Sequence, residues 1–253
     1  MQINGKTIAI TGGGRGIGRA MALAFAAKGG HLALLDMNAQ DLEETKRLVE
    51  AHGVTARTYV CNVTNEEQVI AAMDGIVRDF GRLDVLVNNA GIVKDGLFLK
   101  VKDGQVVGKM GLDAWNAVIG VNLTGVFLCG REAAERMVKL GNGGVLINIS
   151  SISKDGNVGQ TNYTATKSGV AAMAVVWAKE LAKFGIRAAA IAPGYVATDI
   201  LAGMTPETLA KVTAPVPLKR LGEPAEIAQT AIFIVENDFF TGRTIAVDGG
   251  LRI

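Results

Sequence analysis

The chain has 253 residues, of which 49% are hydrophobic, and its 26 Lys and Arg residues nearly balance its 24 Asp and Glu residues. This much apolar material excludes an intrinsically disordered chain. The near balance of charge, without a long basic run, argues against nucleic acid as a partner. Glycine is frequent but scattered rather than gathered into a linker, so we expect residues 1–253 to form a single domain.

Short runs of β-branched and aliphatic residues predict seven buried strands. In chain order they are Thr7–Thr11, His31–Leu35, Thr58–Cys61, Val85–Val87, Val145–Ile149, Ala188–Ala192 and Thr244–Val247. Amphipathic helical stretches lie between them, and an alternation of strands and helices indicates a parallel sheet, because each right-handed crossover lays its helix on the sheet. We therefore predict an α/β fold: a doubly wound seven-stranded parallel sheet of the Rossmann type, with helices on both faces.

A glycine-rich turn, Thr11-Gly12-Gly13-Gly14-Arg15-Gly16-Ile17-Gly18, follows the first strand and precedes a helical run. Glycines permit a tight turn, let a pyrophosphate approach the backbone N–H groups and allow the helix to pack closely on the sheet. The helix N-terminus adds unpaired donors and the positive end of its dipole. We predict a dinucleotide site with contacts from Gly12, Arg15, Gly16, Ile17 and Gly18. The spacing TGxxxGxG resembles the short-chain dehydrogenase/reductase family.

Asp36 ends the second predicted strand, where an acidic side chain can accept hydrogen bonds from both ribose hydroxyls of NAD. The extra phosphate of NADP would meet this carboxylate, and like charges ~4 Å apart repel by ~1 kcal/mol in water and ~4 kcal/mol at an effective dielectric constant of 20. Arg15 argues for NADP instead, since similar NADP-dependent proteins commonly use such an arginine to hold the extra phosphate. Asp36 could instead be a helix cap and Arg15 a solvated side chain. We expect NAD rather than NADP.

Further polar segments follow later strands or lie on predicted helices, and we expect them to converge on one crevice. Ligands of a doubly wound sheet collect at the carboxyl ends of its strands. The segments are Asn88-Asn89-Ala90-Gly91 after the fourth strand, Asn122 in a helix, Ser150-Ser151 after the fifth strand, Tyr163 to Lys167 in a helix, and Pro193-Gly194 after the sixth strand.

Tyr163 and Lys167 lie one helical turn apart, so both can face that crevice. A free tyrosine has a pKa of ~10, and a neighbouring cation lowers it by favouring the phenolate. We expect Lys167 to lower the pKa of Tyr163, which then exchanges a proton with a substrate oxygen as hydride moves. A Tyr and a Lys at this spacing are common by chance, so the pair gains weight only from the other segments.

The glycine turn, NNAG, Asn122, a serine, YxxxK and PG occur in the order of the short-chain dehydrogenase/reductase family and cover essentially the whole chain. The resemblance implies that Asn122 supports a water-linked proton relay with Lys167. It also implies that Asn62 and Val63 contact adenine, although Asn62 could simply be a turn residue. Further cofactor contacts implied by it are Asn89, Ala90, Gly91, Tyr163, Lys167, Pro193, Gly194, Val196 and Thr198.

Two adjacent serines compete for the catalytic role of holding the substrate oxygen. The family usually places this serine 13 residues before the tyrosine, which selects Ser150. Alignment of the strand end with the family's double serine selects Ser151 and shortens the loop that follows. Neighbouring strand residues face opposite ways, so only one can serve. We choose Ser151, because a loop absorbs a deletion more easily than a strand changes register.

The segments Gly156–Tyr163 and Arg220–Pro224 look most like the 3-oxoacyl-[acyl-carrier-protein] reductases of fatty acid metabolism. The resemblance implies an NAD(H)-dependent oxidoreductase that interconverts a 3-oxoacyl thioester and its 3-hydroxyacyl form. The alternatives are a dehydrogenase of another secondary alcohol, such as a sugar, a steroid or a small hydroxy compound, and a non-catalytic nucleotide sensor. Leu97–Gly111 is longer than expected and either reshapes substrate access or forms a surface hairpin. Met204–Lys211 is the expected substrate lid.

The helical stretch Gly169–Trp177 is apolar nearly all round, so we expect another subunit to cover it, and similar proteins are commonly homotetramers.

No export signal is visible, and the most apolar helical stretch, Gly169–Ala178, is too short to cross a membrane. Cys61 and Cys129 are expected to be buried reduced thiols. These features predict a cytoplasmic protein without a membrane partner. His31 and His52 lack ligand-like spacing, so we assign no metal site.

Overall fold

The computed structural model describes residues 1–198 and 205–252. Its strands are β1 (Thr7–Thr11), β2 (His31–Asp36), β3 (Ala56–Val60), β4 (Val85–Asn88), β5 (Leu99–Lys102), β6 (Gln105–Lys109), β7 (Gly144–Ile149), β8 (Ile186–Pro193) and β9 (Thr244–Val247). Its α-helices are α1 (Gly16–Ala27), α2 (Ala39–Glu50), α3 (Glu66–Phe80), α4 (Leu112–Ile119), α5 (Gly125–Leu140), α6 (Thr161–Leu181), α8 (Pro206–Thr213) and α9 (Pro224–Glu236). Short helical turns are η1 (Gly120–Thr124), η2 (Ile152–Asp155) and η3 (Ala182–Phe184). Met204, where the expected lid begins, lies outside the described residues.

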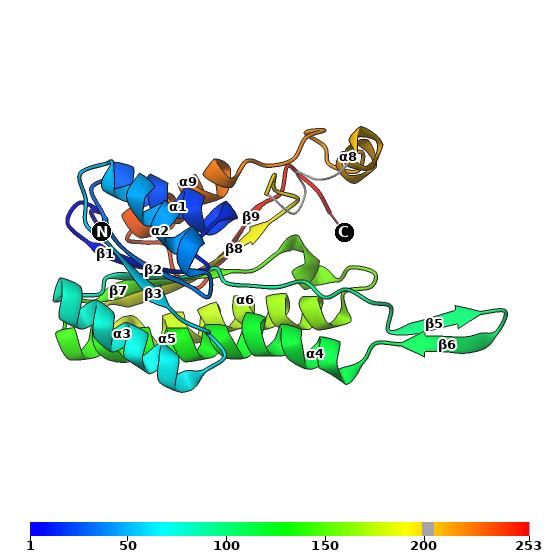
Figure 1. The fold of residues 1–253 in the computed structure, drawn as a ribbon, viewed down its shortest axis with the longest axis horizontal. Helices are drawn as coiled ribbons and strands as arrows, with labels where there is room; N and C mark the ends of the chain where they lie inside the picture. The colour runs from blue at the N-terminus through cyan, green and yellow to red at the C-terminus, as the bar shows by residue number, and fades with distance from the viewer. Residues whose placement is uncertain (199–204, 253) are drawn as a thin grey trace.

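One parallel sheet of seven strands, in the order β3-β2-β1-β4-β7-β8-β9, forms the centre of the molecule. Helices α1, α2 and α9 cover one face, and α3, α5 and α6 cover the other (Figure 1). The strand order reverses between β1 and β4, which opens a crevice at their carboxyl ends. The predicted doubly wound fold is confirmed.

Alternate residues of each strand supply two separate apolar layers, as the period of two in a strand requires. Ile8 and Ile10 of β1 pack with α1 and α9, whereas Ala9 packs on the opposite face with α3 and α5. Burial on both faces explains why the strands read as continuous apolar runs.

The third strand begins two residues before its predicted start, at Ala56 rather than Thr58. Ala56 pairs with Leu32 and is fully buried, while Val60 at the other end is 63% exposed. Cys61 has already left the strand and lines a cavity. The prediction placed the strand on its run of apolar residues. Because β3 is the edge strand of the sheet, however, apolar residues such as Val60 and Cys61 do not mark where the strand lies.

Helix α3 illustrates how local signals set element ends. The Asn65 side chain accepts a hydrogen bond from the Gln68 N–H (3.0 Å), which caps the first turn. Gly81 ends the helix in the left-handed region, with φ 69°. Between these ends Val69, Ala72 and Ile76 face the core.

A longer apolar helix than the predicted stretch Gly169–Ala178 is Leu112–Leu140, formed by α4, η1 and α5 in continuous succession. By length and composition alone it could cross a membrane. Leu128, Cys129 and Met137 on this helix nevertheless lie in the core against the sheet. Its apolar character is therefore that of a helix which packs on a sheet. The prediction missed it because the charged residues of α5 interrupt its apolar run.

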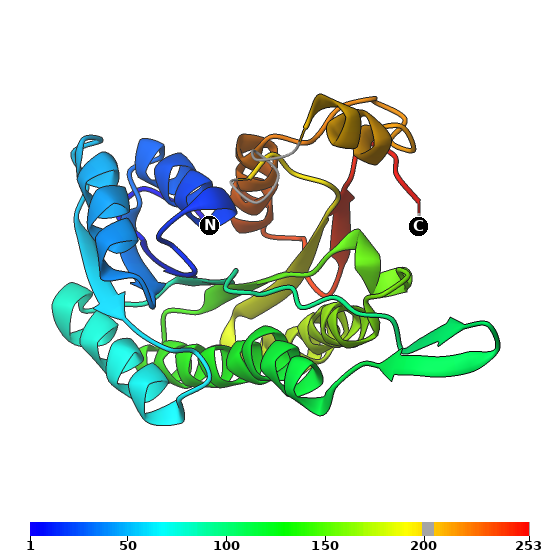
Figure 2. The ribbon, with the colours of Figure 1, turned by 45° about the vertical axis from the view of Figure 1, so that its right-hand side comes forward.

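The long segment after β4 forms the antiparallel hairpin β5–β6, which extends away from the body of the molecule (Figures 1 and 2). Val101 and Val106 pair across it and are 56% and 62% exposed. The hairpin alternative raised for Leu97–Gly111 is therefore the one that the structure adopts.

Candidate active site at the carboxyl ends of the strands

The glycine-rich turn joins β1 to α1 through two left-handed residues, Gly12 (φ 64°) and Gly16 (φ 54°). Side chains rarely tolerate this backbone region, so the turn depends on glycine. A Cβ on Gly18 would lie 2.0 Å from the Gly12 carbonyl oxygen. The absence of a side chain at Gly18 thus allows helix α1 to pack closely against the turn.

A cavity of about 840 Å³ lies beside this turn. Its size falls within the range of sites for small molecules and cofactors. The predicted cofactor residues that line it are Gly12, Arg15, Gly16, Ile17, Asp36, Asn62, Val63, Asn89, Ala90, Gly91 and Thr198. Residues that the sequence reasoning missed also line it, namely Leu35, Met37, Asn38, Ala39, Gln40, Cys61, Ile92 and Val121. Most of these adjoin predicted residues in the chain, and only the fold selects them. The turn, the cavity and the polar rim fit a dinucleotide.

Asp36 lies on the rim of this cavity with its carboxylate fixed by backbone donors. It accepts hydrogen bonds from the Gly14 N–H (3.1 Å) and the Asn38 N–H (3.2 Å). Asn38, rather than Asp36, caps helix α2 with its side chain. The carboxylate therefore sits between the phosphate-binding turn and the start of α2, where its charge acts on the cavity.

Asn62 makes the turn contacts raised as an alternative. Its Oδ1 accepts hydrogen bonds from the Thr64 N–H (3.0 Å) and the Thr64 hydroxyl (2.9 Å). The same residue also lines the cavity together with Val63. The two interpretations are compatible, because the turn places the segment Asn62-Val63 against the cavity.

Asn89 connects the end of β4 to the glycine turn. Its Nδ2 donates to the carbonyl oxygens of Thr11 and Gly12, each at 3.1 Å, and its N–H donates to the Thr11 hydroxyl (3.0 Å). Two strands that flank the crevice are thereby held at a fixed separation. Gly194 ties β8 to β9 in a similar way, since its N–H donates to the Val247 carbonyl (2.9 Å).

Asn122 lies in the π-helical turn η1 and is fully buried. Its side chain exchanges two hydrogen bonds with the backbone of Ile92: Oδ1 accepts from the N–H (2.8 Å), and Nδ2 donates to the carbonyl (2.9 Å). A Cβ on Gly91 would lie 3.4 Å from Asn122 Oδ1 and 3.6 Å from Lys167 Nζ. The structure thus brings Asn122 and Lys167 together beside the segment that follows β4.

Lys167 is buried, and its Nζ donates a hydrogen bond to the Ile149 carbonyl (2.7 Å). Burial disfavours the charged ammonium and lowers the pKa of Lys167 to about 8. Nζ also lies 5.4 Å from the centre of the Tyr163 ring. Near neutral pH this lysine is therefore close to its titration range.

Tyr163 is largely withdrawn from solvent, and the Ser151 side chain lies near its hydroxyl. Burial raises the pKa of Tyr163, and the nearby Ser151 side chain opposes the rise without cancelling it. The expectation that Lys167 lowers this pKa is wrong for the structure as described, because desolvation of the phenolate outweighs the other influences. Burial of Tyr163 therefore favours its protonated form over the phenolate.

Ser150 and Ser151 face opposite sides of the strand end, as expected from the alternation of side chains. Ser150 is buried and its hydroxyl donates to the Lys167 backbone carbonyl (2.6 Å), away from the phenol. The Ser151 Oγ accepts from the Ser153 N–H (3.1 Å), and this side chain lowers the pKa of the nearby Tyr163. Of the two serines, Ser151 is therefore the one on the side of Tyr163.

Comparison with known proteins places this chain among nicotinamide-dependent oxidoreductases. A family model described as enoyl-(acyl carrier protein) reductase matches residues 12–252. A 3-oxoacyl-[acyl-carrier-protein] reductase of Thermotoga maritima is 39% identical over 100% of both chains. A short-chain type dehydrogenase/reductase from Mycobacterium marinum has a similar structure, with a TM-score of 0.89, 30% identity and coverage of 98% and 96% of the two chains. An NAD+-bound xylitol dehydrogenase gives a TM-score of 0.87 at 33% identity, with coverage of 99% and 100%.

Proposed function

The chain belongs to the short-chain dehydrogenase/reductase family, and from this premise we propose that it interconverts a 3-oxoacyl thioester and its 3-hydroxyacyl form with NAD(H). The chemistry rests on one observation: Tyr163 has Ser151 near its hydroxyl and Lys167 against its ring, and Lys167 Nζ would lie 3.6 Å from a Cβ on Gly91, which lines the cavity of dinucleotide size. The substrate class rests on the likeness to the Thermotoga maritima reductase over the whole chain.

Tyr163 donates its hydroxyl proton to the carbonyl oxygen of the substrate. Ser151 holds the same oxygen through a second hydrogen bond and so favours the charge that develops there. The nicotinamide cofactor, when bound, supplies the hydride. Lys167, with a pKa of about 8, and Asn122 lie on the inner side of Tyr163 and form the path by which the phenolate regains its proton.

A panel of ketones tests this function. Purified protein is mixed with NADH and acetoacetyl thioesters of coenzyme A or an acyl carrier protein, and the loss of NADH absorbance is followed. The expected result is turnover of the thioesters at values of kcat/KM well above those for sugar and steroid ketones. If a sugar ketone is preferred instead, the second candidate, a dehydrogenase of another secondary alcohol, replaces the first. The likeness to xylitol dehydrogenase is the observation that favours this second candidate.

We expect the carboxylate of Asp36 to make the protein prefer NAD over NADP. Replacement by alanine removes a charge that repels the extra phosphate, so the preference for NAD is expected to fall by roughly tenfold or more. Asp36→Asn keeps an acceptor for the Gly14 N–H and separates loss of charge from loss of the turn contact. The measurement is the ratio of kcat/KM for NADH and NADPH. A wild-type protein that already prefers NADPH would contradict this interpretation of Asp36.

Replacement by alanine is expected to have different effects at the two serines. Ser151→Ala is expected to lower kcat by ~10²–10³-fold, since it removes a donor from the developing charge. Ser150→Ala removes the hydrogen bond to the Lys167 carbonyl and is expected to cost ~1 kcal/mol of unfolding free energy with most activity retained. Steady-state kinetics and urea unfolding of both variants decide between them. Loss of activity in Ser150→Ala alone would reverse the assignment.

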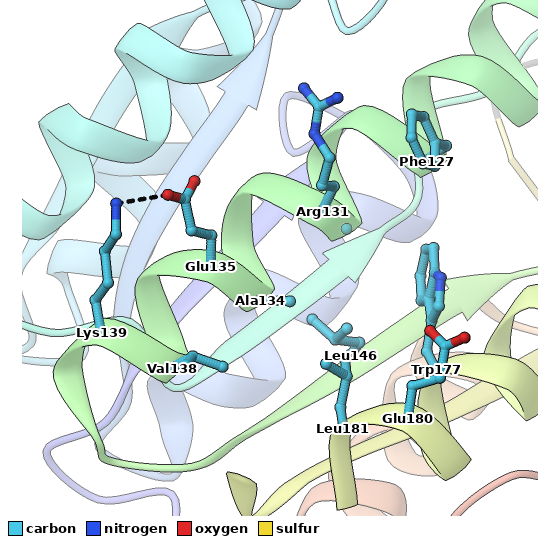
Figure 3. Close-up of a pocket in the computed structure, with 11 residues that line it drawn as sticks. Phe127, Arg131, Ala134, Glu135, Val138, Lys139, Leu146, Trp177, Glu180 and Leu181 are labelled. Atoms are coloured by element: carbon cyan, nitrogen blue, oxygen red, sulfur yellow. Dashed lines mark ion pairs between the residues drawn. The ribbon is translucent and has the colours of Figure 1, made fainter.

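We also propose a homotetramer in the cytoplasm. A groove of about 470 Å³ runs between α5 and α6, and Figure 3 shows Phe127, Trp177 and Leu181 around it. The side chain of Phe127 is 43% exposed, and a second subunit that packs on this groove would bury it. The buried free thiols Cys61 and Cys129 support a reducing compartment. Light scattering tests the assembly: four times the mass of the chain is expected, and a monomer would contradict it.

A further inference from the structure

The backbone carbonyl of Gly14, within the glycine-rich turn, is held by side chains from two helices. It accepts hydrogen bonds from Nε (3.1 Å) and Nη2 (2.7 Å) of Arg19 in α1 and from the hydroxyl of Thr45 in α2 (2.8 Å). Arg19 Nε also donates to Thr45 Oγ1 (2.9 Å), so the two side chains orient each other. We call Arg19 and Thr45, with the Gly14 carbonyl between them, the carbonyl clamp.

The two side chains of the carbonyl clamp have little freedom of their own. Thr45 is fully buried, and a buried hydroxyl is costly unless it is hydrogen-bonded. The guanidinium of Arg19 also donates to Glu44 Oε2 (3.0 Å). A planar guanidinium that engages a carbonyl, a hydroxyl and a carboxylate together is restricted to one orientation. The place of the Gly14 carbonyl is therefore fixed by α1 and α2 as well as by the turn.

The N–H of Gly14 faces the carboxylate of Asp36. It donates to Asp36 Oδ2 (3.1 Å), and a Cβ on Gly14 would lie 3.1 Å from the same oxygen and 2.8 Å from Asp41 Cβ. The carbonyl of Gly14 belongs to the peptide group that leads to Arg15, which lines the cavity. Since this peptide group is planar, a shift of the carbonyl moves the backbone beside both Asp36 and Arg15.

We propose that Arg19 and Thr45 are positioning residues that set the choice between NAD and NADP by holding the Gly14 backbone against Asp36. The proposal rests on the proposed preference for NAD, because it concerns the same carboxylate. A carboxylate can bind ribose hydroxyls and repel a phosphate only while it stays in place, and supporting hydrogen bonds keep such a group within ~0.5 Å. Arg19 and Thr45 do not line the cavity themselves, so they act through the turn.

A purely structural role is the competing explanation, because the same hydrogen bonds join α1 to α2. Loss of that role would lower the free energy of unfolding and weaken the binding of both dinucleotides alike. The ratio of the dissociation constants of NADPH and NADH separates the two explanations. Only a change in the position of Asp36 or Arg15 relative to the extra phosphate alters this ratio.

The test measures both dissociation constants by quenching of protein fluorescence, so it needs no substrate. Thr45→Val removes the hydroxyl and keeps the shape of the side chain, and the ratio is expected to fall by roughly fivefold, the effect of one hydrogen bond. Thr45→Ser keeps a hydroxyl and is expected to retain the wild-type ratio. If Thr45→Val does not fold, Arg19→Lys takes its place, because lysine keeps the charge but has no planar fork.

Thr241→Val is the matched control. The Thr241 hydroxyl also accepts from a backbone N–H and donates to a carbonyl, both of Ala188 (3.1 and 3.3 Å), but Thr241 does not line the cavity. The wild-type ratio is expected in this variant.

A double-mutant cycle shows whether the carbonyl clamp acts through the carboxylate. In an Asp36→Asn background, Thr45→Val is expected to leave the ratio unchanged. A wild-type ratio in Thr45→Val overturns the role of the clamp, and so does an equal fall with and without the Asp36 carboxylate or in Thr241→Val. A wild-type protein that binds NADPH more tightly overturns the proposed preference for NAD instead, and the change of the ratio in Thr45→Val still decides the effect of the clamp.

Discussion

Tyr163→Phe is expected to lower kcat for reduction of a 3-oxoacyl thioester by ~10²–10⁴-fold, the usual contribution of a general acid. The change removes only the hydroxyl, which lies near Ser151, and keeps the ring against which Lys167 Nζ lies. Because Tyr163 does not line the cavity beside the glycine turn, NADH affinity is expected to stay within a few-fold of wild type. NADH consumption measures turnover, and quenching of protein fluorescence measures binding.

Tyr59→Phe is the control for this variant. Its hydroxyl also has a single side-chain partner, Asp79 (2.9 Å), but it lies on β3, at the far edge of the sheet. Wild-type activity is expected in Tyr59→Phe. Undiminished turnover in Tyr163→Phe would remove the proposed acid and with it the mechanism.

Gly18→Ala is expected to weaken NADH binding by ~10²-fold or more and to lower the free energy of unfolding by ~1–3 kcal/mol. The new Cβ would lie 2.0 Å from the Gly12 carbonyl oxygen and 2.8 Å from Asn89 Nδ2. The first of these atoms is backbone, so the turn must move rather than a side chain. Since the turn supplies the N–H groups for the pyrophosphate, its displacement removes the fit to the phosphates. Fluorescence titration with NADH and urea unfolding measure the two effects.

Gly108→Ala provides the matched control in strand β6. A Cβ there would meet Lys100 Cβ at 3.7 Å, an ordinary contact. Wild-type affinity for NADH is expected in this variant. Equal affinities in Gly18→Ala and wild type would show that the turn does not bind the phosphates.

The sequence was sufficient for the architecture because its signals are local and repeated. Strand after strand reads as a continuous apolar run, and the glycine turn stands between β1 and α1 in the required order. The error in a strand position arose where apolar residues are not buried in the sheet. Val60 ends the edge strand β3 with its side chain exposed, and the apolar Cys61 lies beyond the strand, so the predicted third strand was shifted.

Most residues that line the cavity were predicted from the sequence, but the energies of the site were not. The predicted cofactor contacts that do not line the cavity are Gly18, Tyr163, Lys167, Pro193, Gly194 and Val196. Tyr163, Lys167 and Asn122 could be selected from spacing and resemblance, and their roles stay predictions. The direction of the pKa shift of Tyr163 was wrong, since burial depends on the whole fold and not on the distance to Lys167 in the chain.

The most direct test of the account follows the hydrogen itself. The protein is incubated with acetoacetyl thioester and NADH that carries deuterium at the transferable position, and the 3-hydroxyacyl product is analysed by mass spectrometry. The account predicts one deuterium on the carbinol carbon in wild type and a strongly reduced yield of the same labelled product in Tyr163→Phe. A product without deuterium, or no product from any ketone of the panel, would contradict it.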